Sequence, residues 1–204
     1  MRGAIVLAGG PSRRMGRAKP LVLLGGVPLV VRVVLSALEV ADEVVVVTKG
    51  VGAPQIRRVL PEGVTLVMDT QRVQSPLVGF ADGAAALASE YVAFLPCDLP
   101  FLSPALLRTL FEAAAGHDAA VPRWPDGRIE PMVAVYRRER ARDAANAALA
   151  RGARANTDLI RNLPDVVYVP VEVLRRVDPD LESLLNVNTP ADLEAAERRV
   201  PPRR

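Results

Sequence analysis

The stretch Leu7-Ala8-Gly9-Gly10-Pro11-Ser12-Arg13-Arg14-Met15-Gly16-Arg17-Ala18-Lys19-Pro20 directly follows a short apolar run near the start of the chain. Two adjacent glycines let backbone N–H groups approach a ligand and form an anion-binding nest. Four cations crowd the same stretch: Arg13, Arg14, Arg17 and Lys19. The pattern is neither a Walker A loop, which needs Lys-Ser/Thr after the last glycine, nor a GxGxxG turn. We therefore expect a polyphosphate-binding loop of another type; the alternative is a purely structural turn.

Outward from this stretch, short β-branched runs alternate with longer segments of helical spacing, as in repeated βαβ units. The expected strands are Ala4–Leu7, Glu43–Thr48, Val64–Met68, Tyr91–Leu95, Ala119–Pro122, Met132–Tyr136 and Val166–Val169. The expected helices are Leu29–Leu38, Ala53–Leu60, Leu77–Ser89, Pro104–Ala115 and Arg138–Ala150, with a last helix after Thr189. This order predicts an α/β fold with a mostly parallel sheet, in one domain over residues 1–200 with a mobile tail at 201–204.

Composition narrows the functional classes. The 204 residues are 50% hydrophobic and carry a net charge of only +3, which argues against a disordered chain and against a nucleic-acid binder. The single Cys97 cannot form an internal disulfide, and no signal peptide or membrane span is evident. We expect a cytoplasmic protein without membrane or nucleic-acid partners.

Lysine is scarce: the 26 basic residues comprise 24 arginines and two lysines, Lys19 and Lys49. Lys19 lies within the glycine loop, where a cation suits a triphosphate. Lys49 has no such context and is expected to be an ordinary residue without a role in the site.

Asp98 follows the apolar run Tyr91–Leu95, within Pro96-Cys97-Asp98-Leu99-Pro100. Ligands of open α/β sheets bind beyond the carboxyl ends of the strands, where strand order reverses. If the first and fourth runs are neighbours, Asp98 faces the glycine loop and is a natural Mg²⁺ ligand beside a triphosphate. The alternative is a carboxylate that only caps the next turn. Cys97 is expected to pack as a small apolar residue.

Two further polar positions belong to the same predicted edge. Asp69 follows Val64–Met68 and can accept hydrogen bonds from guanine N1–H and N2–H₂ or from ribose hydroxyls, or simply form a turn. Asn186-Val187-Asn188 precedes the last helix, and an amide oxygen there can either order the turn or serve a hard cation. His117, the only histidine, lies away from these elements, which disfavours Ser-His-Asp chemistry.

Taken together, Leu7-Ala8-Gly9-Gly10-x-Ser12-x-Arg14-Met15-Gly16-x-x-Lys19 resembles the signature loop of nucleotidyltransferases with a Rossmann-like, glycosyltransferase-A-type sheet in three α/β/α layers. Pro76-Leu77-x-Gly79, Pro96-Cys97-Asp98-x-Pro100 and Asn186-Val187-Asn188-Thr189-Pro190 resemble the molybdenum cofactor guanylyltransferases. The resemblance covers about residues 3 to 198. It implies transfer of GMP from GTP to the phosphate of molybdopterin, with release of pyrophosphate and with Mg²⁺. It also implies a hand-over contact with molybdoenzymes or cofactor-insertion proteins.

The resemblance also implies residue roles. Leu7, Ala8, Gly9 and Gly10 would hold the nucleotide through main-chain groups. Lys19 and Arg14 would act on the phosphates, Asp69 would help bind GTP, Asp98 would bind GTP and Mg²⁺, and Asn188 would lie on the acceptor or metal side. Two positions depart from the family pattern: Thr48 stands where an Asn is frequent, and Glu130 where a neutral amide or His is expected. The contacts of the loop arginines Arg72, Arg123 and Arg128 with the acceptor are left open.

Other functions share these features. The same chemistry can serve another acceptor: cytidylyl transfer to molybdopterin, GMP transfer to a cobinamide phosphate, or nucleotidyl transfer to a sugar phosphate. A non-catalytic nucleotide-binding carrier is a different class, which would bind nucleotide without releasing pyrophosphate.

Overall fold

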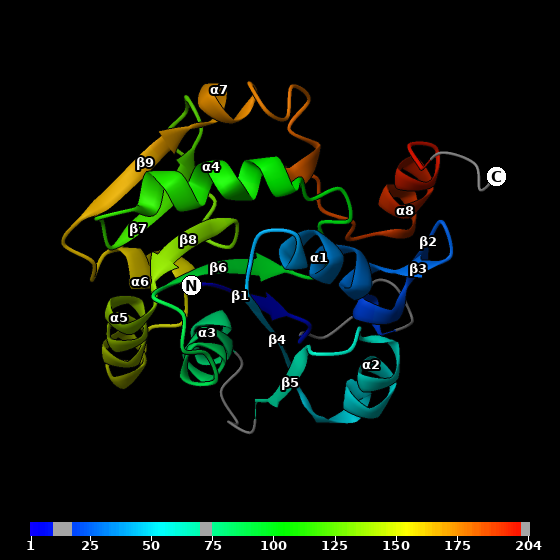
Figure 1. The fold of residues 1–204 in the computed structure, drawn as a ribbon, viewed down its shortest axis with the longest axis horizontal. Coiled ribbons are helices and arrows are strands. Elements are labelled where there is room, and N and C mark those ends of the chain that lie inside the picture. Colours follow the sequence, from blue (N-terminus) through cyan, green and yellow to red (C-terminus); the bar gives the residue numbers. More distant parts are fainter. Residues whose placement is uncertain (10–17, 70–74, 201–204) are drawn as a thin grey trace.

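The computed structural model describes residues 1–9, 18–69 and 75–200, and its centre is a seven-stranded sheet in the order β5-β4-β1-β6-β8-β7-β9 (Figure 1). β8 is antiparallel to both of its neighbours, and every other pair in this sheet is parallel. The strands are β1 (Arg2–Leu7), β4 (Glu43–Thr48), β5 (Thr65–Met68), β6 (Tyr91–Pro96), β7 (Ala119–Arg123), β8 (Ala134–Arg137) and β9 (Val166–Pro170). The predicted mostly parallel sheet is confirmed.

Helices cover both faces of the sheet, so the chain forms the predicted α/β/α layers (Figure 1). α1 and α4 pack on one face, and α3 and α5 pack on the other. The helices are α1 (Leu29–Leu38), α2 (Ala53–Val59), α3 (Pro76–Ala85), α4 (Pro104–Ala114), α5 (Arg138–Ala150), α6 (Asn156–Ile160), α7 (Val171–Leu174) and α8 (Pro190–Glu197). Short 3₁₀ turns are η1 (Lys19–Leu21), η2 (Gly50–Gly52) and η3 (Glu182–Leu184). None of the described helices is both long and apolar enough to cross a membrane.

The continuous valine run in β4 follows from burial on both faces. Val44 and Val46 join the core under α1 and α4, whereas Val45 and Val47 join the core under α3 and α5. Side chains alternate across a strand, so a strand covered on both sides needs apolar residues at every position. The same rule explains the apolar β1 and β6.

The strand order reverses beside β1, the first strand in the chain. β4 and then β5 lie on one side of β1, and β6 lies on the other, with Leu7 paired to Val47 and to Pro96. The carboxyl ends of these four strands therefore meet at one edge, where open α/β sheets form their ligand crevice. The expected neighbourhood of the first and fourth apolar runs is confirmed.

A small two-stranded ribbon ties the end of the chain to its beginning. β2 (Leu23–Leu24) and β3 (Val27–Pro28) are joined by Gly25-Gly26, and both glycines have positive φ. The Glu197 carboxylate of α8 accepts hydrogen bonds from the Gly25 N–H, and Ala196 packs against the buried Leu24. This contact places α8 next to the segment that follows the glycine loop.

Two boundaries differ clearly from the sequence prediction, one because of a distant contact and one beside a local turn. α3 ends at Ala85 rather than at Ser89, since Glu43 of β4 accepts hydrogen bonds from the N–H groups of Ala88 and Ser89. The last part of the predicted strand Met132–Tyr136 becomes β8, which begins only at Ala134. The turn over residues 123–128 is a hairpin, closed by the Trp124 N–H donating to the Arg128 carbonyl at 2.8 Å. The predicted tail at 201–204 lies outside the described residues.

Candidate active site

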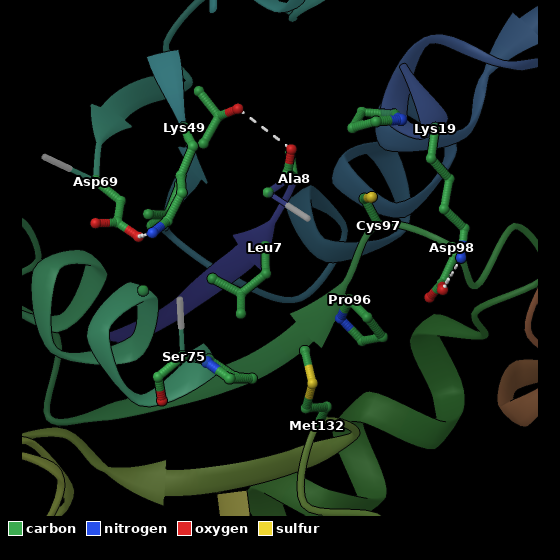
Figure 2. Close-up of a pocket in the computed structure, with 16 residues that line it drawn as sticks. Leu7, Ala8, Lys19, Lys49, Asp69, Ser75, Pro96, Cys97, Asp98 and Met132 are labelled. Carbon is green, nitrogen blue, oxygen red and sulfur yellow. Dashed lines mark hydrogen bonds and ion pairs between the residues drawn. The ribbon is translucent and has the colours of Figure 1, made fainter. Parts of the chain in front are cut away.

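A cleft of about 450 Å³ opens at the carboxyl edge of the sheet, within the size range of small-molecule sites (Figure 2). Residues at the ends of the four strands around the switch point line it, together with Lys19 and the start of α3. From the strand ends come Leu7, Ala8, Gly9, Thr48, Lys49, Asp69, Pro96, Cys97 and Asp98. Six of the residues proposed from sequence thus share one cavity: Leu7, Ala8, Gly9, Lys19, Asp69 and Asp98. Gly10 and Arg14, with the rest of residues 10–17, lie outside the described residues, as does Arg72.

At one end of the cleft, Lys19 joins Asp98 and Asn188. Its ammonium forms an ion pair with Asp98 Oδ2 and donates to Asn188 Oδ1 at 2.6 Å. The Lys19 and Asp98 side chains are only 20% and 15% exposed, which strengthens their charge interaction relative to bulk water. Within the described residues, the Lys19 ammonium donates these two hydrogen bonds. An ammonium has three N–H groups, so the third can donate to a ligand.

The backbone around Asn188 is fixed from two sides. The Val187 N–H donates to the Asp98 carbonyl at 2.9 Å, and the N–H groups of Asn188 and Thr189 donate to the Asp192 carboxylate at 2.9 and 2.8 Å. The Thr189 hydroxyl accepts from the Asp192 N–H, which completes a capping box at the start of α8. The hydrogen bond from the Asn188 backbone is the largest of the effects that hold the pKa of Asp192 below its usual value.

One carboxylate oxygen of Asp98 is positioned to bind a ligand. Within the described residues, Asp98 Oδ1 is buried and has no hydrogen-bond partner. A buried carboxylate oxygen without a partner is costly and needs an explanation. The same residues contain no group of three or more His, Cys, Asp or Glu side chains suited to a metal. Mg²⁺ commonly takes one or two carboxylates and completes its shell with substrate phosphates and water, so this donor set fits a cation shared with a phosphate.

At the other end of the cleft, Lys49 pairs with Asp69. The Lys49 Nζ lies 3.3 Å from Asp69 Oδ2, and the side chains are 29% and 5% exposed. Figure 2 places this pair across the cleft from Lys19 and Asp98. The expectation that Lys49 has no part in the site is therefore wrong. Its position directly after β4, at the same edge as Asp69 and Asp98, was the signal that could have identified it.

The main-chain groups of Leu7 and Ala8 form hydrogen bonds to neighbouring strand ends. The Ala8 N–H donates to the Val47 carbonyl, the Leu7 carbonyl accepts from the Cys97 N–H, and the Ala8 carbonyl accepts from the Thr48 hydroxyl. The Ala8 N–H is therefore engaged within the sheet. The nest expected at Gly9 and Gly10 stays a prediction, because Gly10 lies outside the described residues. Both carbonyls retain a second lone pair for a hydroxyl or amino group, and the Leu7 side chain forms part of the wall.

Thr48 and Glu130, the two positions that depart from the family pattern, each make a local hydrogen bond. The Thr48 hydroxyl is buried against the Ala8 carbonyl at 3.2 Å, so it holds two strand ends together. Glu130 accepts a 2.7 Å hydrogen bond from the indole N–H of Trp124. The Arg128 guanidinium stacks over the same indole ring, 5.1 Å from its centroid. Arg123 stacks over Tyr168 at 5.7 Å. Glu130 therefore has a structural partner within the hairpin that follows β7.

Two other candidates are excluded as nucleophiles or bases. Burial, reinforced by the charge of Asp98, raises the pKa of the Cys97 thiol to about 12, so the thiol is inert at neutral pH. His117 precedes β7 at the opposite edge of the sheet and contacts Asp165 at 3.0 Å. The prediction that His117 lies away from the elements around the cleft is confirmed.

The open sheet, its switch point and the charged cleft place the protein in the class of nucleotide-binding α/β proteins. Residues 4–166 match the family model described as a MobA-like NTP transferase domain. The chain belongs to this family. A probable molybdenum cofactor guanylyltransferase of Natronomonas pharaonis is 37% identical, with 98% of each chain covered. A protein of the same description from Methanosarcina acetivorans is 34% identical over 95% of this chain and 89% of its own length.

Solved structures agree with the fold. The molybdopterin-guanine dinucleotide biosynthesis protein A of Archaeoglobus fulgidus superimposes with a TM-score of 0.82 at 30% identity, over 98% of both chains. The 2-C-methyl-D-erythritol 4-phosphate cytidylyltransferase of Thermus thermophilus is similar in fold alone, with a TM-score of 0.70 at 22% identity over 98% of this chain and all of the other.

Proposed function

We propose that the protein transfers GMP from GTP to the terminal phosphate of molybdopterin and releases pyrophosphate. The observation that carries this proposal is the cluster of Lys19, Asp98 and Asn188 at the switch point of the sheet. Family membership and the names of the relatives, molybdenum cofactor guanylyltransferases, support GTP as donor and molybdopterin as acceptor.

The two ends of the cleft suit the two ends of a nucleotide. Lys19 provides a cation for the phosphates, whereas the nearly buried Asp69 provides an acceptor for base N–H groups. Between them lie the Leu7 side chain and the strand-end carbonyls, which suit the sugar. We therefore propose that GTP binds with its guanine beside β5 and its phosphates beside β6.

The chemical step is a single in-line displacement at the α-phosphorus. An oxygen of the molybdopterin phosphate forms the new P–O bond, while the bond between the α-phosphorus and the oxygen bridging to the β-phosphorus breaks, and pyrophosphate takes that electron pair. A phosphate monoester is largely ionised near neutral pH, with its second pKa about 6, so no general base has to remove a proton. Lys19 stabilises charge on the phosphoryl oxygens, and the rigid strand ends align the reactants.

We also propose that Asp98 Oδ1 and Asn188 Oδ1 hold Mg²⁺ together with the triphosphate. Both are the hard oxygen donors that this ion prefers, and the unpartnered Asp98 oxygen supports the assignment. When bound, Mg²⁺ supplies charge neutralisation at the phosphates. The Lys19 ammonium orients both donor side chains before the nucleotide arrives.

A pyrophosphate-release assay tests the donor and the acceptor. GTP, CTP, ATP and UTP are each combined with molybdopterin, a cobinamide phosphate or a sugar 1-phosphate in the presence of Mg²⁺. We expect release with GTP and molybdopterin. Faster release with CTP, or with another acceptor, would replace the assignment by one of the alternative nucleotidyl transfers, and tight GTP binding without release would indicate a carrier.

The site assignment has its own test. Asp98→Asn should reduce Mg²⁺-dependent turnover by about 10²- to 10³-fold, the scale for losing one charged transition-state contact. Asp165→Asn, which alters a carboxylate at the opposite edge of the sheet, is the matched control and should leave turnover unchanged. Unaltered Mg²⁺ dependence in Asp98→Asn would remove Asp98 from the metal site.

We propose a cytoplasmic location, supported by the single buried thiol of Cys97. We further propose that the product passes to molybdoenzymes or cofactor-insertion proteins, because a cofactor made by this reaction is used by other proteins.

A further inference from the structure

We infer that Lys49 reads the base of the nucleotide, by donating a hydrogen bond to the 6-oxo group of guanine while Asp69 accepts from N1–H and the 2-amino group. This inference rests on the proposed function and assigns the residue that distinguishes GTP from other nucleotides. Both side chains line the cleft at the end away from Lys19 and Asp98 (Figure 2).

The geometry of the pair gives an ordered row of hydrogen-bonding groups. The Lys49 ammonium lies 3.3 Å from Asp69 Oδ2, so the row runs from Lys49 Nζ to Asp69 Oδ2 and then to Asp69 Oδ1. In hydrogen-bonding terms this row is donor, acceptor, acceptor. A carboxylate oxygen has more than one lone-pair site, so Oδ2 can accept from Lys49 and from a base at the same time.

Guanine presents the complementary row along its Watson–Crick edge: the O6 acceptor, the N1–H donor and the 2-amino donor. With O6 beside Lys49, N1–H meets Oδ2 and the 2-amino group meets Oδ1. The carboxylate alone supplies two of these three contacts. The ammonium supplies the third and adds a charge-assisted hydrogen bond to the carbonyl oxygen.

Other bases place like groups against like groups in this row. Cytosine sets its amino group against the ammonium and its N3 and O2 lone pairs against the carboxylate, and adenine also mismatches at the first two positions. Uracil matches at two positions but sets O2 against Oδ1. Such unpaired or repelling groups in a desolvated site generate specificity as effectively as attractive contacts do.

The chain around Lys49 is built to hold it at this edge. Thr48 is anchored to the Ala8 carbonyl, and the Asp69 N–H donates to the Thr48 carbonyl at 2.8 Å, which fixes the two strand ends against each other. Gly9 lies beside the Lys49 main chain, since a Cβ there would be in ordinary contact with the Lys49 backbone nitrogen at 3.6 Å. Asp82 of α3 is near enough to feel both charges of the pair: burial and then the Asp69 charge raise its pKa, and the Lys49 charge opposes them. Lys49 thus interacts with two carboxylates, Asp69 in the cleft wall and Asp82 in α3.

Nucleotide analogues test the inference by equilibrium binding, which needs no acceptor. 6-Thio-GTP replaces the 6-oxo group by a poor acceptor, and ITP lacks the 2-amino group. The wild-type protein should bind GTP about tenfold more tightly than 6-thio-GTP. This is the scale of a charge-assisted hydrogen bond, reduced because the sulfur still accepts weakly from Lys49. In Lys49→Met this preference should vanish, while the preference for GTP over ITP persists.

Two further variants keep the test decisive. Lys49→Gln retains a neutral donor and should keep part of the preference for GTP over 6-thio-GTP. Asp69→Asn should lose the preference for GTP over ITP. If Lys49→Met weakens GTP, 6-thio-GTP and ITP by the same factor, Lys49 acts on the phosphates or the fold and the inference is overturned. A failure of the proposed function has a different signature: selective GTP binding without transfer to molybdopterin.

Discussion

Replacing Gly79 by alanine should impair nucleotide binding more than stability, and Gly83→Ala should do the reverse. Both glycines lie in α3 and face the sheet. A Cβ at Gly79 would lie 2.6 Å from Leu7 Cδ2, at the wall of the cleft. A Cβ at Gly83 would lie 2.6 Å from Ile5 Cγ2 and 3.0 Å from Val47 Cγ2, inside the core.

The two clashes differ in how they can be relieved. Leu7 is half-buried and its methyl can turn into the open cleft, so Gly79→Ala gains helix propensity at little net cost to the free enzyme. Ile5 and Val47 are β-branched and fully buried, so Gly83→Ala retains the overpacking cost of about 1–3 kcal/mol, offset by up to about 1 kcal/mol of helix propensity. When GTP pushes Leu7 back, that cost returns in the Gly79→Ala complex and weakens binding by about 5- to 150-fold.

The assay pairs urea unfolding with GTP titration for both variants. Gly79→Ala should unfold near the wild-type midpoint and bind GTP more weakly, whereas Gly83→Ala should unfold earlier and bind GTP normally. Wild-type GTP affinity in Gly79→Ala would refute the placement of the nucleotide against Leu7.

Three further predictions concern single side chains. Several effects lower the pKa of Glu43, chief among them the hydrogen bond from the Ser89 hydroxyl. The ionised carboxylate therefore stabilises the fold above the ordinary pKa of 4.5, and this stabilisation is lost as the pH falls through the lowered pKa. The difference in unfolding free energy between wild type and Glu43→Gln, measured in urea, should shrink from pH 7 to pH 3; a constant difference would contradict this. Cys97, with its pKa raised to about 12, should resist iodoacetamide at pH 8 and react only in denaturant; rapid alkylation of the native protein would show an accessible thiolate. Asp192→Ala should lower kcat/KM for GTP in the presence of Mg²⁺ about tenfold by releasing Asn188, on the scale of one lost cap of about 1–2 kcal/mol; a loss confined to thermal stability would make Asp192 merely a cap.

The parts of the fold that local patterns encode were predictable from the sequence. β4 and α5 occur at the expected residues because unbroken β-branched and Ala-rich segments specify them. Lys19 and Asp98 also meet as expected, since the segment of Lys19 follows β1 and Asp98 follows the adjacent strand β6. Asn188, expected near the carboxylate, joins them through Lys19.

The parts that depend on distant partners were not predictable. The early end of α3 requires Glu43 of another strand, and the ribbon of β2 and β3 is only two residues long on each side. Lys49 was missed because its significance lies in Asp69, twenty positions further along the chain, and no local pattern links the two. Pairings across such separations are determined by packing rather than by periodicity.

Single-turnover reactions with GTP labelled at either the α- or the γ-phosphate, in the presence of molybdopterin and Mg²⁺, test guanylyl transfer most directly. The account predicts that the α-label appears in the molybdopterin product and the γ-label appears only in pyrophosphate. Label from the γ-phosphate in the acceptor, or no α-label transfer by protein that binds GTP, would contradict it.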